Sequence, residues 1–150
     1  MLLKTDRLLV RRFAPEDAED LYAVLSDPEV MRYLEPPFTL AQTEAFILQN
    51  GLCDPPLIYG VVWKRTKELI GHLIWHPWDE TAMELGWVLR RDFWGRGLAR
   101  ELTAALLART GKDVVIECSP EQTVTRHIAE LFGFVPEDTQ PGLLRYRKQK

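Results

Sequence analysis

The segment LGWVLRRDFWGRGLARELTAALLAR, residues 85–109, changes character halfway along, and this change decides the fold. Its first residues, 85–89, have the apolar and aromatic composition of a strand. A turn with Gly95 and Gly97 follows, and then apolar residues recur every three or four positions, as on one helix face. Glycines let backbone N–H groups approach a ligand closely, and a helix start adds unpaired donors and a partial positive charge. The segment therefore predicts an anion site between a strand and a helix.

Pyrophosphate is the anion that such a site favours, and the arginines near the turn add positive charge. Arg90, Arg91, Arg96 and Arg100 fall within eleven residues of a chain whose formal net charge is −3. A local basic cluster in an acidic protein indicates one anionic ligand held at one place, and the net charge argues against nucleic acid as a partner. The GxGxxG pattern after a first strand and the GxxxxGK[ST] loop are both absent. An ordinary glycine turn before a helix remains the alternative for this fragment alone.

Strands and helices follow one another in an informative order around this segment. The predicted strands cover residues 7–13, 57–63, 68–76, 83–89, 113–118 and 143–147. The predicted helices begin near Pro15, Asp27, Thr39, Leu98 and Ser119, the third ending near Gly51 and the fourth near Gly111. Hairpin-like strands come first and a crossover follows. This order predicts one domain over residues 1–150, of α/β (α+β) class, with a mixed, mostly antiparallel central sheet flanked by helices.

Composition excludes several classes of protein. No apolar run approaches the roughly 20 residues that cross a bilayer, and the charges in residues 1–13 do not suit a signal peptide, so we expect a cytoplasmic protein without a membrane partner. Cys53 and Cys118 form no CxxC pair, which favours two free thiols in a reducing compartment. His72 and His76 share one face of a strand, but no third ligand accompanies them, so no metal is expected.

Four stretches carry a resemblance to a known family. They are TDRLLVRRFAPEDAEDLYAVLSDPEVMRYL (5–34), ELGWVL (84–89), FWGRGLARE (93–101) and ELFGFVPE (130–137). In this order they resemble the opening, the fourth strand, the pyrophosphate loop and the Leu-Gly-Phe ending of the GNAT superfamily of N-acetyltransferases. Within that superfamily they are most similar to the RimJ/RimL-like branch of ribosomal-protein-alanine N-acetyltransferases. The resemblance spans nearly the whole chain.

The resemblance implies a single-domain GNAT fold whose fourth and fifth strands splay apart around the pantetheine arm of acetyl-CoA. It implies that the arm pairs with the backbone of Val88, Leu89 and Arg90. It further implies that the pyrophosphate lies on the loop formed by Trp94, Gly95, Arg96, Gly97, Leu98 and Ala99. Arg100 and Gln122 are further candidate contacts, although Gln122 is equally explained as the capping partner of Ser119. The reaction implied is direct attack of a neutral amine on the thioester in a ternary complex.

Three positions depart from the family pattern. Asp92 stands where the loop motif usually has Arg or Gln, and Gln122-Thr-Val-Thr125 replaces an Asn-x-x-Ser. The tyrosine that many GNAT enzymes use as general acid would fall near Ala129 and is missing. The last two departures bear on protonation of the leaving thiolate. Thr125 is our candidate polar group there, acting through a hydrogen bond, with a helix-surface threonine as the alternative.

Glu84 is the candidate general base. An amine must lose a proton before it attacks, because α-amino groups have a pKa of about 8 and lysine of about 10.4. The family places an acidic residue near the acceptor on the strand that holds Glu84. A solvated strand carboxylate, or a partner in an ion pair, is the alternative interpretation of this residue.

The acceptor is the least constrained part of the prediction. Tyr33, Glu35 and Phe38 lie in the region that borders the acceptor site in similar proteins, and they are the candidate substrate-binding residues. The acceptor is expected to be a primary amine, either a protein N-terminus or a small molecule, and the protein a monomer or homodimer. A non-catalytic module that binds or senses acyl-CoA is the alternative function.

Overall fold

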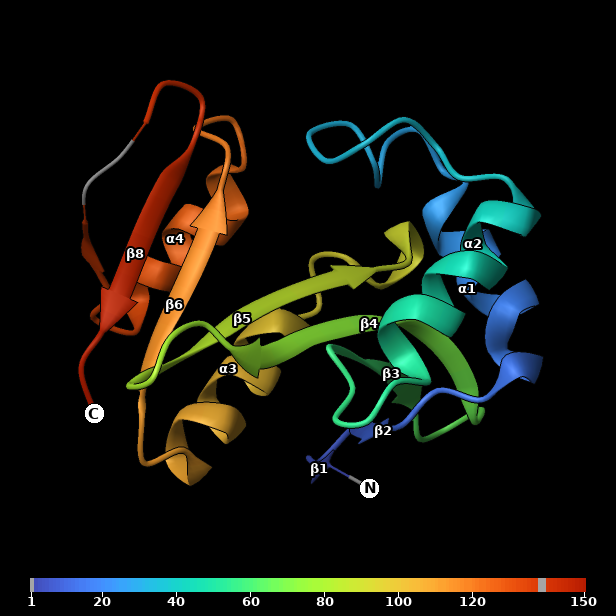
Figure 1. The fold of residues 1–150 in the computed structure, drawn as a ribbon, viewed down its shortest axis with the longest axis horizontal. Coiled ribbons are helices and arrows are strands. Elements are labelled where there is room, and N and C mark those ends of the chain that lie inside the picture. The colour runs from blue at the N-terminus through green and yellow to red at the C-terminus, as the bar shows by residue number, and fades with distance from the viewer. Residues whose placement is uncertain (1, 138–139) are drawn as a thin grey trace.

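A single sheet of eight strands forms the centre of the computed structural model, which describes residues 2–137 and 140–150 (Figure 1). The strands are β1 (Leu3–Lys4), β2 (Leu8–Arg11), β3 (Ile58–Trp63), β4 (Glu68–Pro77), β5 (Ala82–Leu89), β6 (Asp113–Cys118), β7 (Val135–Pro136) and β8 (Leu144–Lys148). Their order across the sheet is β1-β2-β3-β4-β5-β6-β8-β7. Every neighbouring pair is antiparallel except β5 and β6, which run parallel. The predicted mixed, mostly antiparallel sheet is confirmed.

The sheet opens between its two parallel strands. β5 and β6 pair only at their first residues, Ala82 with Asp113 through Glu84 with Val115. Beyond Glu84, β5 stays paired with β4 along its length, while β6 stays paired with β8. The two halves of the sheet therefore diverge into a V, which Figure 1 shows between β5 and β6. This is the splay between the fourth and fifth predicted strands that the resemblance implied.

Helices cover both faces of the sheet. α1 (Ala18–Leu25) and α2 (Leu40–Phe46) pack on one face, where Leu21, Val24 and Leu25 join a core with Val62 and Val88. α3 (Leu98–Arg109) and α4 (Thr123–Leu131) lie on the other face.

The core on the α3 and α4 side contains the apolar face of α3. Leu98, Leu102 and Leu106 are buried against Leu85 and Leu89 of β5. The predicted spacing of apolar residues in this helix is confirmed, since these positions recur at intervals of four.

Most predicted starts and stops agree with the structure. Thr39 caps α2 with a complete capping box: its hydroxyl accepts the N–H of Gln42, whose side chain accepts the N–H of Thr39. Pro15 opens a 3₁₀ turn, Pro15–Asp17, that leads directly into α1. α2 continues as one π turn, Ile47–Gly51, and so ends where the sequence indicated.

The helix predicted from Asp27 is wrong. Residues 27–34 form consecutive turns, in which Glu29 N–H donates to the Asp27 carboxylate and Met31 N–H to the Asp27 carbonyl. Only a few residues separate Pro28 from Pro36, too short a stretch to stabilise a helical nucleus. The turns instead bury Val30 and Met31 against α1.

One smaller expectation also needs correction. α4 begins at Thr123 rather than just after Ser119, because only half of the predicted capping box forms. In β5, Gly86 keeps a regular register with β4. A Cβ at Gly86 would lie 2.9 Å from the Cδ1 of Ile74, so this glycine makes room for a side chain. Among the described residues, no helix is long and apolar enough to cross a membrane.

Candidate active site

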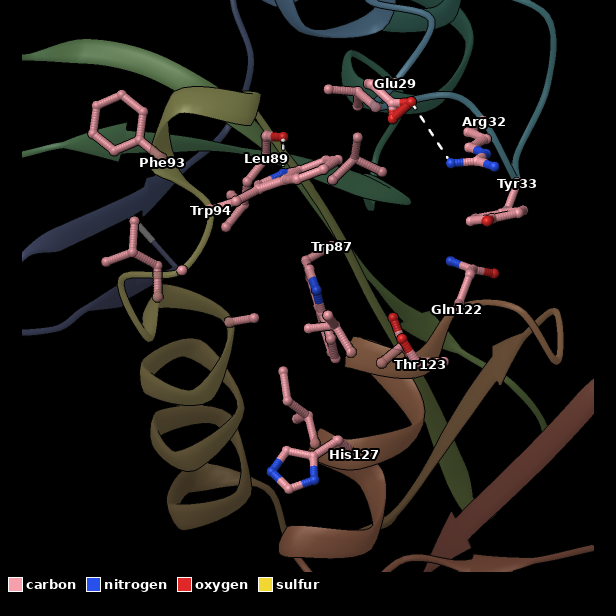
Figure 2. A pocket seen from close by; sticks show the side chains of 18 of the residues that line it. Glu29, Arg32, Tyr33, Trp87, Leu89, Phe93, Trp94, Gln122, Thr123 and His127 are labelled. Atoms are coloured by element: carbon pink, nitrogen blue, oxygen red, sulfur yellow. Dashed lines mark hydrogen bonds and ion pairs between the residues drawn. The ribbon is translucent and has the colours of Figure 1, made fainter.

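A cleft of about 560 Å³ fills the V between the diverging strands (Figure 2). Four segments line it: the turns at 29–34 after α1, the end of β5 at 87–89, residues 93–100 at the start of α3, and residues 121–128 of α4. The first segment comes from one face of the sheet, and the two helices come from the other. The cleft therefore passes through the sheet at the splay, so that two ligands can meet there from opposite sides.

The start of α3 presents a run of unpaired backbone donors to the cleft. Gly95 and Gly97 have φ angles of 73° and 77°, a left-handed conformation that glycine adopts without a steric cost. Within the described chain, none of the six amide N–H groups from Gly95 to Arg100 donates to a protein acceptor; the first such donor is Glu101, to the Gly97 carbonyl. Six free donors at the positive end of a twelve-residue helix form an anion site.

The arginines near this turn differ in whether a carboxylate already pairs with them. Arg90 is engaged by Asp92, with Nε 2.7 Å from its Oδ1, and by Glu68 at 3.3 Å. Arg96 lies over the ring of Phe93, with 4.6 Å between Cζ and the centroid, and makes no ion pair within the described residues. Arg100 likewise has no ion-pair partner there and lines the cleft. Arg100 is therefore the charge that is best placed for an anion in the turn.

One edge of β5 also faces the cleft. Arg90 N–H donates to the Ile70 carbonyl of β4, so in an antiparallel ladder the backbone groups of Trp87 and Leu89 point to the opposite edge. That edge has lost β6 as a partner beyond Glu84. The indole Nε1–H of Trp94 donates to the Leu89 carbonyl at 2.9 Å, and Figure 2 shows the indole lying across the cleft. The remaining backbone groups can pair with an extended ligand that carries amides.

α4 contributes polar side chains to the far wall. Gln122 and Thr125 both line the cleft, and Gln122 Oε1 also accepts the Ser119 N–H at 2.8 Å. The two interpretations of Gln122, as cap and as cleft contact, are thus compatible. Ser119 Oγ is buried without a hydrogen-bond partner among the described residues, so the return half of the capping box is missing. The α4 wall offers hydrogen bonds and no carboxylate except exposed Glu121.

The turns after α1 border the mouth on the other side. Tyr33 lines the cleft with Glu29 and Arg32, which lie 3.8 Å apart as an ion pair (Figure 2). Glu35 and Phe38 lie outside the lining, and the Phe38 ring packs edge-on against Phe46, 5.7 Å between centroids. Of the three candidate acceptor contacts, only Tyr33 therefore reaches the cleft directly.

Glu84 lies at the base of the splay, as the last residue of β5 paired with β6. Strand alternation puts it on the face of β5 that carries Val88, toward α1 and α2. Its Oε2 is 2.7 Å from Nε2 of His76, and it does not line the cleft. Burial raises the pKa of the Glu84 carboxyl above its ordinary value; the His76 side chain opposes this shift, and nearby Glu117 adds to it.

The cleft lining contains most of the residues that the sequence proposed for the coenzyme. They are Val88, Leu89, Trp94, Gly95, Gly97, Leu98, Ala99, Arg100 and Gln122. Thr125, the candidate near the leaving thiolate, also lines the cleft. Arg90, Arg96 and Glu84 lie outside the lining, although their neighbours in the chain are part of it.

Several lining residues were not predicted from the sequence, among them Trp87, Thr123 and His127. Trp87 belongs to the strand edge, and Thr123 and His127 share one face of α4 (Figure 2). The four-residue spacing of Thr123 and His127 could have indicated a polar helix face. The sequence gives no pattern that indicates which strand edge lacks a partner.

His72 has a structural role. It is 4% exposed, its ring lies 5.3 Å from that of Phe46, and burial lowers its pKa to about 4. In the described residues no cluster of three His, Cys, Asp or Glu side chains could hold a metal ion. Both cysteines are free thiols, and burial raises the pKa of Cys118. Cys118 is therefore protonated at neutral pH and is a poor nucleophile.

Comparison with known proteins gives this arrangement a family. The family described as "Acetyltransferase (GNAT) domain" matches residues 7–135. This chain belongs to the GNAT acetyltransferase family. It is similar to the uncharacterized N-acetyltransferase YnaD of Bacillus subtilis (strain 168), with 29% identity over 140 residues that cover 89% of this chain and 82% of YnaD. It is an acyltransferase enzyme, and its fold is the single-domain GNAT fold.

Solved structures of GNAT proteins have the same fold. A GNAT-family acetyltransferase from Bacillus anthracis aligns with a TM-score of 0.88 and 26% identity, covering 99% of this chain and 98% of that one. RimL, a ribosomal L7/L12 α-N-protein acetyltransferase in complex with coenzyme A, aligns with a TM-score of 0.82 and 19% identity, covering 97% and 95%. At that identity the likeness to RimL concerns the fold alone.

Proposed function

We propose that this GNAT enzyme transfers the acetyl group of acetyl-CoA to a primary amine by direct attack in a ternary complex. The observation that carries the proposal is the run of six free amide donors, Gly95 to Arg100, at the open end of the splayed strands. A diphosphate held there directs an attached arm along the unpaired edge of β5. The opposite mouth, beside Tyr33, stays open for a second ligand.

The residues present fit acetyl-CoA along its length. The amides of the α3 turn and the Arg100 guanidinium would hold the pyrophosphate, and Arg96 is near enough in the chain to add charge. The backbone of Trp87 and Leu89 would pair with the pantetheine amides, with Val88 and Arg90 fixing that strand against β4. When bound, the coenzyme supplies an activated acyl carbon and a thiolate leaving group. Positioning alone can lower the barrier by several kcal/mol.

Glu84 is the residue we propose to accept the amine's proton. It lies at the base of the splay and outside the cleft lining, so the proton would pass from the amine to Glu84 through water. A carboxyl group whose pKa is raised is also a stronger base than an ordinary carboxylate, which narrows the gap to the ammonium pKa.

Thr125 is the proposed hydrogen-bond donor near the leaving thiolate. It lies on α4 in the wall of the cleft, one turn from the position of Ala129, where many relatives of this fold carry tyrosine. A threonine hydroxyl is too weak an acid to give up its proton readily. Thr125 therefore stabilises the thiolate through a hydrogen bond, and the proton that the attacking nitrogen loses on amide formation reaches the sulfur through water.

A peptide N-terminus is our preferred acceptor, in keeping with the RimJ/RimL-like motifs. Support comes from those motifs and from the similar fold of RimL, which acts on the N-terminus of a ribosomal protein. The mouth beside Tyr33 is exposed, as a site for the end of a longer chain requires. A small amine is the alternative acceptor within the same mechanism.

The experiment that tests this function measures free thiol released from acetyl-CoA over a panel of peptides with different N-termini and of small amines. Thiol release that depends on peptide N-termini supports a peptide as the acceptor. Thiol release with small amines alone would instead identify a small amine as the acceptor. Tight binding of acetyl-CoA without thiol release for any amine would instead support an acyl-CoA sensor. Absence of acetyl-CoA binding contradicts the proposal as a whole.

A further inference from the structure

The hydrogen bonds of His76 fix where its proton lies. Its Nδ1 is 2.9 Å from the carbonyl oxygen of Pro77, the neighbouring residue. A carbonyl oxygen only accepts hydrogen bonds, so Nδ1 must carry the proton in this contact. In the neutral ring, Nε2 then has no proton and can only accept. The same Nε2 lies 2.7 Å from Oε2 of Glu84.

This geometry requires a proton between the two side chains. An unprotonated Nε2 and an ionised carboxylate both present lone pairs and would repel each other at that distance. The contact is therefore made either by an imidazolium with a carboxylate, or by a neutral ring with a carboxylic acid. In both cases His76 and Glu84 hold one proton between them.

We propose that His76 is a positioning residue that shares one proton with Glu84, and that this pair acts as the base of acetyl transfer. The inference rests on the proposed role of Glu84 and deepens it. The pair first gives its shared proton to water. It then takes one proton from the substrate ammonium, which leaves a neutral amine to attack, and so returns to its starting state. As the C–N bond forms and the C–S bond breaks, the nitrogen loses a second proton, which reaches the thiolate through water. One proton therefore enters the pair and one leaves it in each turnover.

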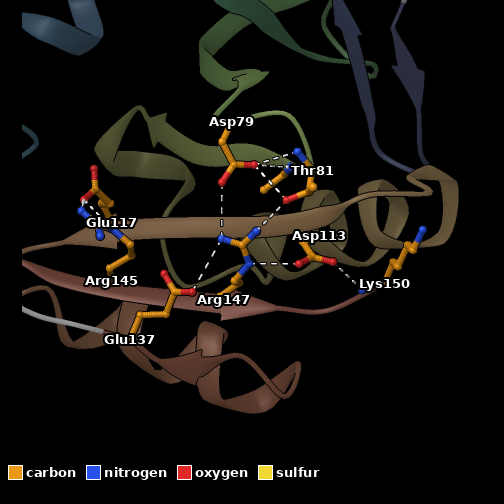
Figure 3. A network of polar contacts seen from close by, with 9 residues as sticks. Asp79, Thr81, Asp113, Glu117, Glu137, Arg145, Arg147 and Lys150 are labelled. Carbon is orange, nitrogen blue, oxygen red and sulfur yellow. Dashed lines mark hydrogen bonds and ion pairs between the residues drawn. The ribbon is translucent and has the colours of Figure 1, made fainter.

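The surroundings of the pair favour this sharing. Side-chain exposures are 23% for His76 and 19% for Glu84, so the pair is partly shielded but still reaches solvent. Glu117 of β6 faces Glu84, and its charge is balanced by Arg145 of β8 at 3.1 Å (Figure 3).

The other charged groups nearby are occupied with one another. Arg147 of β8 lies 3.0 Å from Asp113, 3.7 Å from Asp79 and 3.6 Å from Glu137 (Figure 3). No lysine or arginine among the described residues pairs with Glu84. His76 is therefore the cationic partner available to Glu84.

The first test reads the protonation of His76 without using the reaction. The chain has three histidines, so ¹⁵N-imidazole NMR of the whole protein, with His76→Gln for assignment, resolves His76. We expect the Nδ1–H tautomer at high pH. In Glu84→Gln we expect the ¹⁵N resonance of Nε2 to move while that of Nδ1 stays in place, because only Nε2 contacts the side chain of residue 84. The Nε2–H tautomer, or an Nε2 resonance that does not move in Glu84→Gln, overturns the pair.

The second test follows activity in His76→Gln, whose amide still donates to Glu84 but cannot titrate. Free imidazole and carboxyl groups titrate about two units apart, so we expect the acid limb of kcat/KM to move to lower pH by about 1 unit or more. KM for acetyl-CoA and the thermal midpoint should stay unchanged. A uniform loss of kcat with an unmoved acid limb indicates a merely structural histidine and overturns the inference. Failure of the proposed function itself appears separately, as absence of turnover in the unaltered enzyme.

Discussion

At the scale of single residues, the proposed role of Glu84 depends on how the fold surrounds it. Its carboxylate lies at the last paired position of β5, half-buried and near a second carboxylate, Glu117. The sequence alone allowed an ordinary ion-pair partner as well as a base. The structure shows the ion-pair partner, His76, and this contact is compatible with the proposed base, because a histidine can give up its proton near neutral pH, whereas a lysine or arginine cannot.

Replacing Glu84 by glutamine is the sharpest change at this scale. Glu84→Gln keeps the size and hydrogen bonding of the side chain but removes its basicity. We expect kcat/KM to fall about 10²- to 10⁴-fold, the usual contribution of a general base. Steady-state kinetics across pH, with calorimetric titration of CoA, provide the measurement. CoA affinity should not change, because Glu84 lies outside the cleft lining.

A matched control for that change is Glu80→Gln. Glu80 is exposed in the turn between β4 and β5 and makes no side-chain hydrogen bond or ion pair with the described residues. Kinetics of this variant should match those of the unaltered enzyme. Near-normal kcat/KM for Glu84→Gln at every pH would remove Glu84 from the mechanism.

At the scale of elements, the start of α3 is predicted to bind the pyrophosphate and little else of the coenzyme. Arg100→Gln removes the cation of that turn that lines the cleft and is unpaired within the described residues. Hydrogen bonds to charged groups contribute about 1.5–3 kcal/mol, so CoA affinity should fall about 10- to 100-fold. Calorimetric titration with pantetheine, which lacks the pyrophosphate, should show no change. An equal loss for both ligands would place the pyrophosphate elsewhere.

The contact between β4 and β5 is a second prediction for an element. A Cβ at Gly71 would lie 2.1 Å from the Val88 carbonyl oxygen, so Gly71→Ala must push β5 away from β4. We expect a loss of about 2 kcal/mol or more in the free energy of unfolding, together with weaker CoA binding. Gly111→Ala is the matched control, because a Cβ there meets no atom within 4 Å. Denaturant unfolding of both variants measures their losses in the free energy of unfolding. Small and equal losses for the two variants would contradict a close approach of the strands at Gly71.

The start of α1 gives a prediction about acid stability. Asp17 accepts Arg11 at 2.8 and 3.0 Å and the Ala14 N–H at 2.8 Å. Burial alone would raise the pKa of the Asp17 carboxyl, but these bonds outweigh it, and the pKa is lowered from 3.8. The stability from a lowered carboxyl pKa is present in full above 3.8 and is lost as pH falls through the folded value.

Asp17→Asn should therefore cost about 2 kcal/mol in the free energy of unfolding at neutral pH. The cost should shrink at pH values below the unfolded pKa of aspartate, about 3.9. Denaturant titrations at several pH values measure this difference. A cost that does not change with pH would mean that the charge of Asp17 does not contribute.

The existence of most elements was predictable because each rests on a local pattern. Strands 57–63, 68–76 and 113–118 and the helix face from Leu98 follow from period and composition alone. β1 and β7 were not predicted, since each has two residues and exists only through its neighbour in the sheet. The turns at 27–34 carry a helical pattern, but their burial against α1 and the flanking prolines decide their shape.

At the scale of the whole molecule, the decisive feature is the loss of pairing between β5 and β6. This divergence creates one cleft that opens on both faces of the sheet, with helices α3 and α4 on one side and the turns after α1 on the other. The glycine turn at the start of α3 was predictable because glycines, arginines and a helix start lie together in the sequence. The contact between His76 and Glu84 was not, because it forms only when β4 and β5 pair.

The account also predicts that the acetyl group never resides on the protein. Cys118 is buried with a raised pKa, and the described lining of the cleft contains neither a cysteine nor a serine. The reaction should therefore occur in one step between two bound ligands. A ternary complex, rather than an acetyl-enzyme, is the state that this geometry supports.

A single-turnover experiment tests that central claim most directly. The enzyme is mixed with an equal amount of acetyl-CoA, and thiol and protein mass are followed before and after the best amine is added. We predict no thiol and no acetylated protein before the amine, and then one amide formed for each thiol released. Thiol release with an acetylated protein before the amine arrives, or no amide with any amine, would contradict the account.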